Sequence, residues 1–117
     1  MSNEPRVIVH PDTDALLEAH ARRFIKRAKG VMSEFGEFTV ALTGGTLGIA
    51  SLEAVRAHPD CDTIDWSRVN VWWGDERWVP REHPDRNAVQ ARRALLDHVP
   101  LDPARVHEFP ASDDGID

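Results

Sequence analysis

The sequence has little cysteine and no long apolar run, and both shortages exclude whole classes of protein. Cys61 is the only cysteine among the 117 residues, so neither an intrachain disulfide framework nor a multi-cysteine metal site can form. No apolar run is long enough to cross a bilayer, and residues 1–6 lack the basic and apolar segments of a signal peptide. We therefore expect a soluble, cytoplasmic protein with no membrane partner.

Positive charge is also scarce. Fourteen Lys and Arg residues stand against 20 Asp and Glu residues, which gives a formal net charge of −6. A nucleic-acid partner requires a basic surface that displaces counterions from phosphates. The basic residues that do cluster, at 22–29 and at Arg92–Arg93, fall on expected helices and are interpreted as solvent-exposed faces. We therefore expect no nucleic-acid partner.

The composition is otherwise that of an ordinary folded domain with one hydrophobic core, since 41% of the residues are apolar and 29% charged. β-Branched and apolar runs predict four strands, over Arg6–His10, Phe38–Leu42, Val69–Trp73 and Arg105–Phe109. Helical periodicity predicts three helices, which begin at residues 12–14, after residues 43–48, and at Asn87 or Ala88. The first helix is expected to weaken or end at Gly30 and Gly36, and the last to end at His98.

This alternation predicts the fold class. A β-α-β-α-β-α-β order is typical of an α/β protein with a parallel sheet and right-handed crossovers. The nearly continuous apolar run Val69–Trp73 indicates a strand covered on both faces. We expect one three-layer domain over residues 1–117, with a parallel sheet and helices on both faces. Ligands of such sheets bind beyond the carboxyl ends of the strands, where the unusual segments 43–48 and 74–87 lie.

The first of these segments, Thr43–Gly44–Gly45–Thr46, joins an expected strand to a helix. Paired glycines let the backbone approach a ligand closely, and the N–H groups at a helix N-terminus suit an anion such as phosphate. Thr43 and Thr46 add hydroxyl donors. A dinucleotide fingerprint would need Gly at position 43, and a P-loop would need a Lys, which is absent after Lys29. A tight turn without a ligand remains the alternative.

The second segment places two carboxylates and a guanidinium after the next strand. Arg77 is suited to a phosphate or carboxylate, which its planar guanidinium binds through paired donors. Asp75 and Glu76 are expected to accept hydrogen bonds from sugar hydroxyls or to orient a catalytic group. Long connections of this kind are often functional. The alternative is a surface ion pair among these three residues.

Together the two segments resemble the 6-phosphogluconolactonase family, in the superfamily that also contains glucosamine-6-phosphate deaminases. The resemblance is carried by Ala41–Thr46, Trp73–Pro80 and His83–Asn87. The deaminases have a Met-Asp-Glu-Tyr-like sequence where this chain has Gly74–Arg77. Two departures from the family pattern are Leu47–Gly48, where many members have Thr-Pro or Pro, and Arg86, where many have Ser.

The resemblance implies a fold, an activity and roles for individual residues. The fold would be the Rossmann-like, N-terminal half of a phosphosugar isomerase/lactonase domain. The activity would be hydrolysis of 6-phosphoglucono-1,5-lactone to 6-phosphogluconate in the oxidative pentose phosphate pathway, with no cofactor and no metal. Gly44, Gly45 and Thr46 would line the substrate pocket, and Arg77 would hold the phosphate. Asp75 and Glu76 would contact the sugar or support the site.

The resemblance assigns no catalytic residue. The family's catalytic His lies in a Gly-Xaa-Gly-Xaa-Asp-Gly-His segment, and this sequence contains none. Lone loop histidines are usually solvated, and His83 is the only one near the expected site. Two alternatives to a lactonase therefore stay open, a non-catalytic phosphosugar-binding module and an inactive truncated product. The truncated product would self-associate through an exposed sheet edge.

Overall fold

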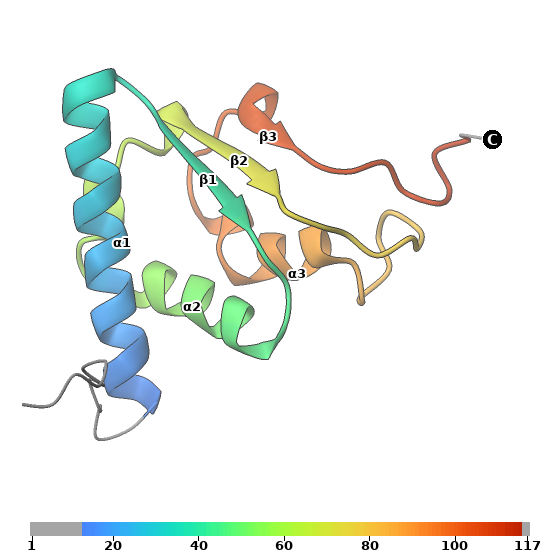
Figure 1. Ribbon diagram of the computed structural model, residues 1–117, viewed down its shortest axis with the longest axis horizontal. Coiled ribbons are helices and arrows are strands. Elements are labelled where there is room, and N and C mark those ends of the chain that lie inside the picture. The colour runs from blue at the N-terminus through green and yellow to red at the C-terminus, as the bar shows by residue number, and fades with distance from the viewer. Residues whose placement is uncertain (1–12, 116–117) are drawn as a thin grey trace, which may run out of the picture.

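The computed structural model describes residues 13–115 and contains a small parallel sheet with three helices (Figure 1). The helices are α1 (Thr13–Phe35), α2 (Thr46–Ala57) and α3 (Asn87–Ala94). The strands are β1 (Phe38–Leu42), β2 (Val69–Trp73) and β3 (Val106–His107). Four single 3-10 turns occupy parts of the connections. The strand expected over Arg6–His10 lies outside the described residues.

The sheet has the order β1-β2-β3 and is parallel throughout, which confirms the α/β class and the parallel pairing predicted from the sequence. β1 and β2 pair without an offset, so that Phe38 lies opposite Val69 and Leu42 opposite Trp73. The N–H of Gly74 donates to the carbonyl of Leu42 at 3.1 Å. Because the two strands end at the same level, the segments that follow them leave the sheet side by side.

Burial alternates along the strands because successive side chains point to opposite faces. The face packed against α1, α2 and α3 carries Phe38, Leu42, Val69, Val71 and Trp73. On the other face Thr39, Ala41 and Trp72 are exposed. The Trp72 side chain is 48% exposed and stacks on the His107 ring, with 3.9 Å between ring centroids. The expected helices on both faces are therefore present on one face, and no described helix lies over the other.

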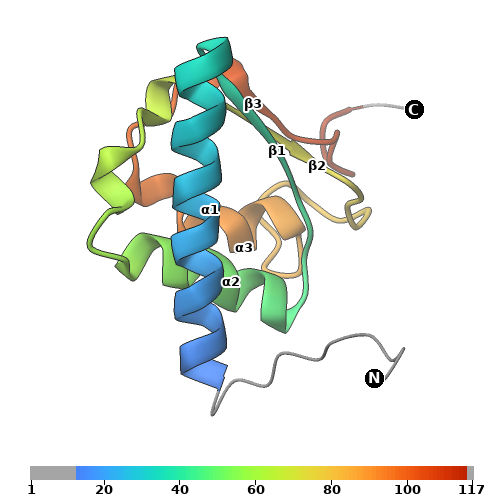
Figure 2. The same ribbon diagram turned by 60° about the vertical axis from the view of Figure 1, so that its left-hand side comes forward.

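The long helix α1 stands beside β1 and packs on α2 (Figure 2). Its buried residues include Ala21, Ile25 and Ala28, at helical spacing, and the Phe24 ring meets Phe38 edge-on at 5.7 Å. Gly36 ends the helix as predicted, with a φ of 83° that favours glycine and an N–H that donates to the carbonyl of Met32. No helix within residues 13–115 combines the length and apolar character needed to cross a membrane.

Two elements are shorter than expected. α3 ends at Ala94 rather than at His98, because Leu95 has a φ of −145° and only one 3-10 turn follows it. β3 covers two of the five residues expected to be a strand: Arg105 belongs to a 3-10 turn, and Glu108 and Phe109 lie beyond the ladder, where the Glu108 carboxylate and the Phe109 carbonyl accept hydrogen bonds from Arg86. β1 and β3 are the two edges of the described sheet. Self-association through such an edge stays a prediction, which light scattering of the purified chain would test.

Candidate functional site

The connection between β1 and α2, together with the first turn of α2, needs its glycines for two reasons, backbone conformation and close contacts. Gly45 has a φ of 91°, a backbone conformation that L side chains rarely adopt. A Cβ on Gly44 would lie 2.1 Å from the side-chain oxygen of Asn87, and one on Gly48 would lie 2.9 Å from the carbonyl oxygen of Thr43. The loop is therefore fixed by close contacts on both sides of the turn.

This loop leaves the N-terminus of α2 open. Gly45 is the N-cap residue and supplies no side-chain acceptor, and the first turn contains no acidic residue. The N–H of Ile49 is bonded to the carbonyl of Gly45 at 3.0 Å. The N–H groups that precede Ile49 in the first turn have no acceptor within the helix. Such donors, together with the partial positive charge of the helix end, favour an anion.

An open cavity of 560 Å³ lies between the two strand-to-helix connections. It is lined by Thr43, Gly44, Gly45, Gly74, Asp75, Glu76, Arg77 and Asn87. Six of the seven residues predicted for the site line this cavity, and the seventh, Thr46, is the first residue of α2. The structure thus brings together two segments that lie about thirty residues apart in sequence, as expected for the ends of parallel strands.

Glu76 is directed at the protein itself. One carboxylate oxygen accepts the N–H of Asn87 at 2.6 Å and that of Arg77 at 2.8 Å, and the other accepts the N–H of Ala88 at 2.9 Å. The side chain is 4% exposed. Asn87 and Ala88 open α3, so the Glu76 carboxylate caps that helix. Of the two roles considered for Glu76, this geometry favours support of the site over contact with a sugar.

Asp75 and Arg77 remain available to a ligand. Both are exposed and both line the cavity. Within residues 13–115 the Asp75 carboxylate makes no hydrogen bond or ion pair, and the Arg77 guanidinium reaches only the carbonyl of Asp85, at 3.5 Å. The surface ion pair considered as an alternative for Asp75, Glu76 and Arg77 does not form.

Asn87 was missing from the predicted site residues, although it connects both segments. It is 5% exposed, and its side-chain amide donates to the carbonyl of Asp75 at 3.3 Å while its oxygen faces Gly44. The available signals were its place at the end of the block His83–Asn87, which is part of the family resemblance, and its position at the start of a helix. Position alone did not distinguish such a residue from a solvated helix end.

His83, Trp78 and Cys61 do not line the cavity. His83 accepts the N–H of Asp85 at 3.0 Å through Nδ1, and Trp78 is 63% exposed. Cys61 is buried, and that burial, with the nearby Asp62 charge, raises the pKa of its thiol. Within the described part of the chain, no group of three or more His, Cys, Asp or Glu residues is placed to hold a metal ion.

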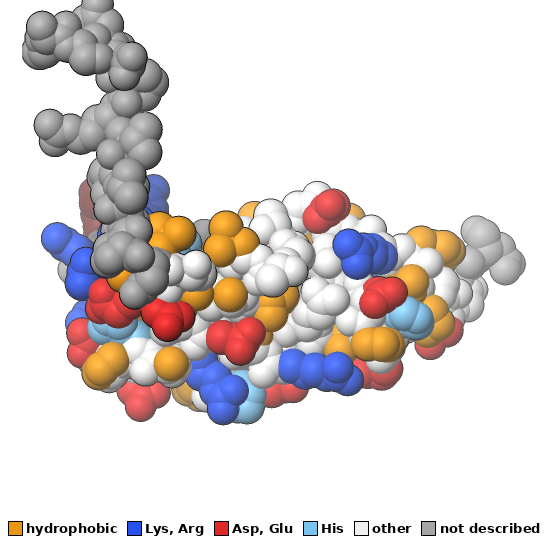
Figure 3. Space-filling view, turned by 90° about the horizontal axis from the view of Figure 1, so that it is seen from below, with side chains coloured by type: hydrophobic (Ala, Val, Ile, Leu, Met, Phe, Trp, Pro, Cys, Tyr) orange, Lys and Arg blue, Asp and Glu red, His pale blue; other side chains and the backbone are white. Residues whose placement is uncertain are grey.

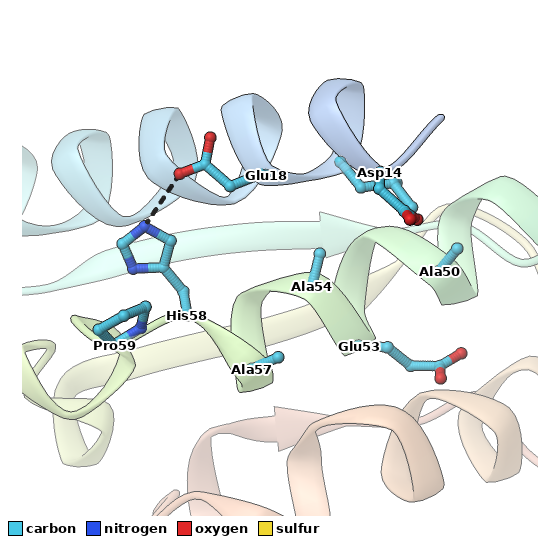
Figure 4. A pocket seen from close by; sticks show the side chains of 9 residues that line it. Asp14, Glu18, Ala50, Glu53, Ala54, Ala57, His58 and Pro59 are labelled. Carbon is cyan, nitrogen blue, oxygen red and sulfur yellow. Dashed lines mark ion pairs between the residues drawn. The ribbon is translucent and has the colours of Figure 1, made fainter. Parts of the chain in front are cut away.

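A second cavity, of 400 Å³, lies between α1 and α2 (Figure 4). Its walls bring carboxylates from both helices, at Asp14, Glu18 and Glu53, and the Glu18 carboxylate pairs with His58 at 3.8 Å. Acidic, basic and hydrophobic side chains are interspersed on the side of the molecule seen in Figure 3. The α1/α2 cavity is lined by three carboxylates and by no described Lys or Arg, whereas the cavity at the strand ends sets Arg77 and the N-cap residue of α2 beside its two carboxylates, so the latter is the better site for an anionic ligand.

Comparison with known proteins assigns this chain to a family. Residues 11–117 match the family model described as glucosamine-6-phosphate isomerases/6-phosphogluconolactonase. A 6-phosphogluconolactonase of Streptomyces coelicolor is 48% identical over 113 residues, which are 97% of this chain and 43% of that protein. A 6-phosphogluconolactonase of Mycobacterium tuberculosis is 41% identical over 105 residues, 90% of this chain and 42% of that protein. The chain belongs to the glucosamine-6-phosphate isomerase/6-phosphogluconolactonase family.

Solved structures show the same fold. A 6-phosphogluconolactonase from Trypanosoma brucei superposes with a TM-score of 0.70 at 23% identity, over 91% of this chain and 40% of that one. A monomeric glucosamine-6-phosphate deaminase superposes with a TM-score of 0.76 at 13% identity, over 96% of this chain and 45% of that one. The chain thus spans less than half the length of the relatives that it matches.

Proposed function

We propose that this chain supplies the phosphosugar-binding part of a 6-phosphogluconolactonase, which hydrolyses 6-phosphoglucono-1,5-lactone to 6-phosphogluconate in the oxidative pentose phosphate pathway. The observation that carries the proposal is the cavity at the strand ends, which is lined both by Gly45, the N-cap residue of the open helix α2, and by Arg77, whose guanidinium makes one long hydrogen bond to the Asp85 carbonyl. The relatives that are 41% and 48% identical and carry the name 6-phosphogluconolactonase support this choice of substrate. The proposal places the protein in the cytoplasm.

Different residues at the site bind different parts of the substrate. The phosphate takes the N–H groups of the glycine loop and of the first turn of α2, with Thr43 and Thr46 as hydroxyl donors. Arg77 binds the phosphate from the other connection. Asp75 accepts hydrogen bonds from sugar hydroxyls, and Glu76 keeps α3 in place behind the site.

The reaction is the hydrolysis of an ester. A water molecule loses a proton to a base as its oxygen bonds to the lactone carbonyl carbon, and the bond to the ring oxygen then breaks as that oxygen takes up a proton. Negative charge develops on the carbonyl oxygen before that bond breaks, so nearby N–H donors lower the barrier. No histidine within residues 13–115 lines the cavity, so no base is assigned to a residue of this chain.

Isothermal titration calorimetry with 6-phosphogluconate tests the binding part of the proposal. We expect saturable binding by the purified chain, weakened about tenfold in Arg77→Met because a charge-assisted contact with the phosphate is lost. Arg93→Met is the matched control, since Arg93 is an exposed arginine on α3 outside the cavity. Heats of dilution alone, or equal affinities for the two variants, would contradict the proposal.

A second candidate function is a phosphosugar-binding module without catalysis. It is favoured by the same cavity, which holds anion donors from two connections but no histidine among the described residues. Lactone hydrolysis by the chain, measured against the spontaneous rate, separates the two functions. Saturable binding of 6-phosphogluconate together with a rate equal to the background would favour the module.

A further inference from the structure

Arg86 is a buried cation directly behind the proposed site. It is 0% exposed, and it is one of two buried polar residues in the described part of the chain, the other being its neighbour Asn87. Burial of a guanidinium is unfavourable unless hydrogen bonds and opposite charge compensate for the lost water. The partners of Arg86 therefore indicate what the residue holds together.

Those partners come from two different parts of the chain. On one side, Nη2 donates to the carbonyl of Phe109 at 2.6 Å and to the Glu108 carboxylate at 3.2 Å. On the other side, Nε lies 4.0 Å from the Glu76 carboxylate and has no hydrogen-bond partner. The contact with Glu76 is therefore one of charge, while the contacts with the segment after β3 are hydrogen bonds.

A second arginine strengthens the attachment of that segment. Arg81 pairs with the Glu108 carboxylate at 3.1 Å and with Asp114, and its N–H donates to Asp113 at 2.8 Å. Glu108 thus pairs closely with the guanidiniums of Arg81 and Arg86, with that of Arg92 farther away at 3.9 Å, and the chain after β3 is fixed against the connection that leads from β2 to α3. Of Arg81 and Arg86, only the latter also approaches Glu76.

We propose that Arg86 is a positioning residue of the phosphosugar site: its charge holds the Glu76 carboxylate at the N-terminus of α3, and its hydrogen bonds attach the segment after β3 to the same point. Through Glu76 it fixes the start of α3, and with it the side chain of Asn87 against Gly44. The role in ligand binding rests on the proposed function, whereas the effect on Glu76 does not.

The test compares Arg86→Met, which removes the charge at similar length, with Arg92→Met. Arg92 is the matched control because it also approaches Glu108, at 3.9 Å, but is not paired with Glu76. The first measurement is amide hydrogen exchange at Asn87 and Ala88, the donors to Glu76, relative to the Gly74 amide bonded to β1. We expect Arg86→Met to lose about tenfold more protection at Asn87 and Ala88 than at Gly74. Arg92→Met should show no such local loss.

The second measurement is the affinity for 6-phosphogluconate, which should fall about tenfold in Arg86→Met and stay within about twofold in Arg92→Met. Arg86→Lys keeps the charge but not the paired donors, so it should restore part of the protection, and it serves if Arg86→Met does not fold. Equal loss of protection at all three amides would overturn the proposal, because Arg86 would then stabilise the whole fold only. If the unmodified chain binds no phosphosugar, the proposed function fails, and the exchange data still decide whether Arg86 positions Glu76.

Discussion

The two strand-to-helix connections use the same physical property in opposite ways. Each leads from the carboxyl end of a parallel strand to the N-terminus of a helix, where unpaired N–H groups favour negative charge. Before α2 the N-cap residue is Gly45, which has no side chain to cap the helix, and that terminus stays open. The long connection before α3 folds back so that its own Glu76 caps the helix.

Within one cavity, the N-terminus of α2 is therefore suited to bind a ligand, and the N-terminus of α3 supports the structure around it. The N–H groups at the open terminus of α2 are available to an anion that enters the cavity. Those at the closed terminus of α3 already donate to the Glu76 carboxylate. The closed side in turn fixes Asn87, which packs against the glycine loop of the open side. One helix end is thus available to a ligand, and the other supports the loop that leads to it.

Removing the cap of α3 should have the largest effect. Glu76→Ala leaves the amides of Asn87 and Ala88 without an acceptor and Arg86 without its nearest charge on that side, so we expect a loss of about 3 kcal/mol in the free energy of unfolding. Urea unfolding measures it. Glu82→Ala is the control, because the Glu82 side chain is 74% exposed and, among residues 13–115, pairs with Arg92 alone. A loss no larger than that of the control would mean that the cap is unimportant.

Crowding the contact between the two connections should have the next largest effect. Gly44→Ala places a methyl group where the Asn87 side chain lies, so we expect a loss of about 1–3 kcal/mol in stability together with weaker binding of 6-phosphogluconate. Gly74→Ala is the control, since a Cβ there meets nothing within 4 Å. Thermal unfolding and calorimetry give the two quantities. If both variants behave alike, the close approach of Gly44 and Asn87 does not matter.

A carboxylate in the first turn of α2 would give that helix a negative charge at its N-terminus, as Glu76 does for α3. Leu47→Glu puts a carboxylate in the first turn of α2, at a residue that is 60% exposed, without a large change in helix propensity. We expect a gain of about 0.5 kcal/mol in the free energy of unfolding and weaker binding of 6-phosphogluconate. The same carboxylate at the other end of α2, in Ala57→Glu, should destabilise the helix and leave binding unchanged. Unaltered binding in Leu47→Glu would argue against an anion at this terminus.

The smallest expected effect is the pH dependence of the ion pair between Arg81 and Asp114, which attaches the segment after β3 to the connection before α3. A hydrogen bond from Arg81 holds the pKa of the Asp114 carboxyl below its ordinary value of 3.8. Because the folded-state pKa is depressed, this pair stabilises the fold fully above pH 3.8 and loses its effect as the pH falls through the lower value. Asp114→Asn should therefore be less stable than the unmodified chain at neutral pH, and the difference should vanish in strong acid. A constant difference would show that the Asp114 charge is not responsible.

Local sequence patterns were sufficient for β1, β2 and the starts of the three helices, and the residues predicted for the site come from segments that meet in one cavity. Runs such as Phe38–Leu42 and Val69–Trp73 determine β1 and β2 through side-chain alternation and burial, and glycines mark the turn before α2. The cap at Glu76 could not be predicted from local sequence, because it forms only when the long connection before α3 folds back onto the start of that helix. The exposed side of Trp72 was also out of reach, since an apolar run does not show which face other parts of the chain cover.

The unshifted pairing of β1 with β2 has a consequence for how this protein can change by insertion and deletion. The connections that follow β1 and β2 begin at the same level of the sheet, because Leu42 lies opposite Trp73. One residue added within β1 would move the glycine loop by about 3.3 Å along the sheet and turn Leu42 to the opposite face. A change in the length of either connection leaves this register intact, whereas an insertion or deletion within β1 requires a matching change in β2.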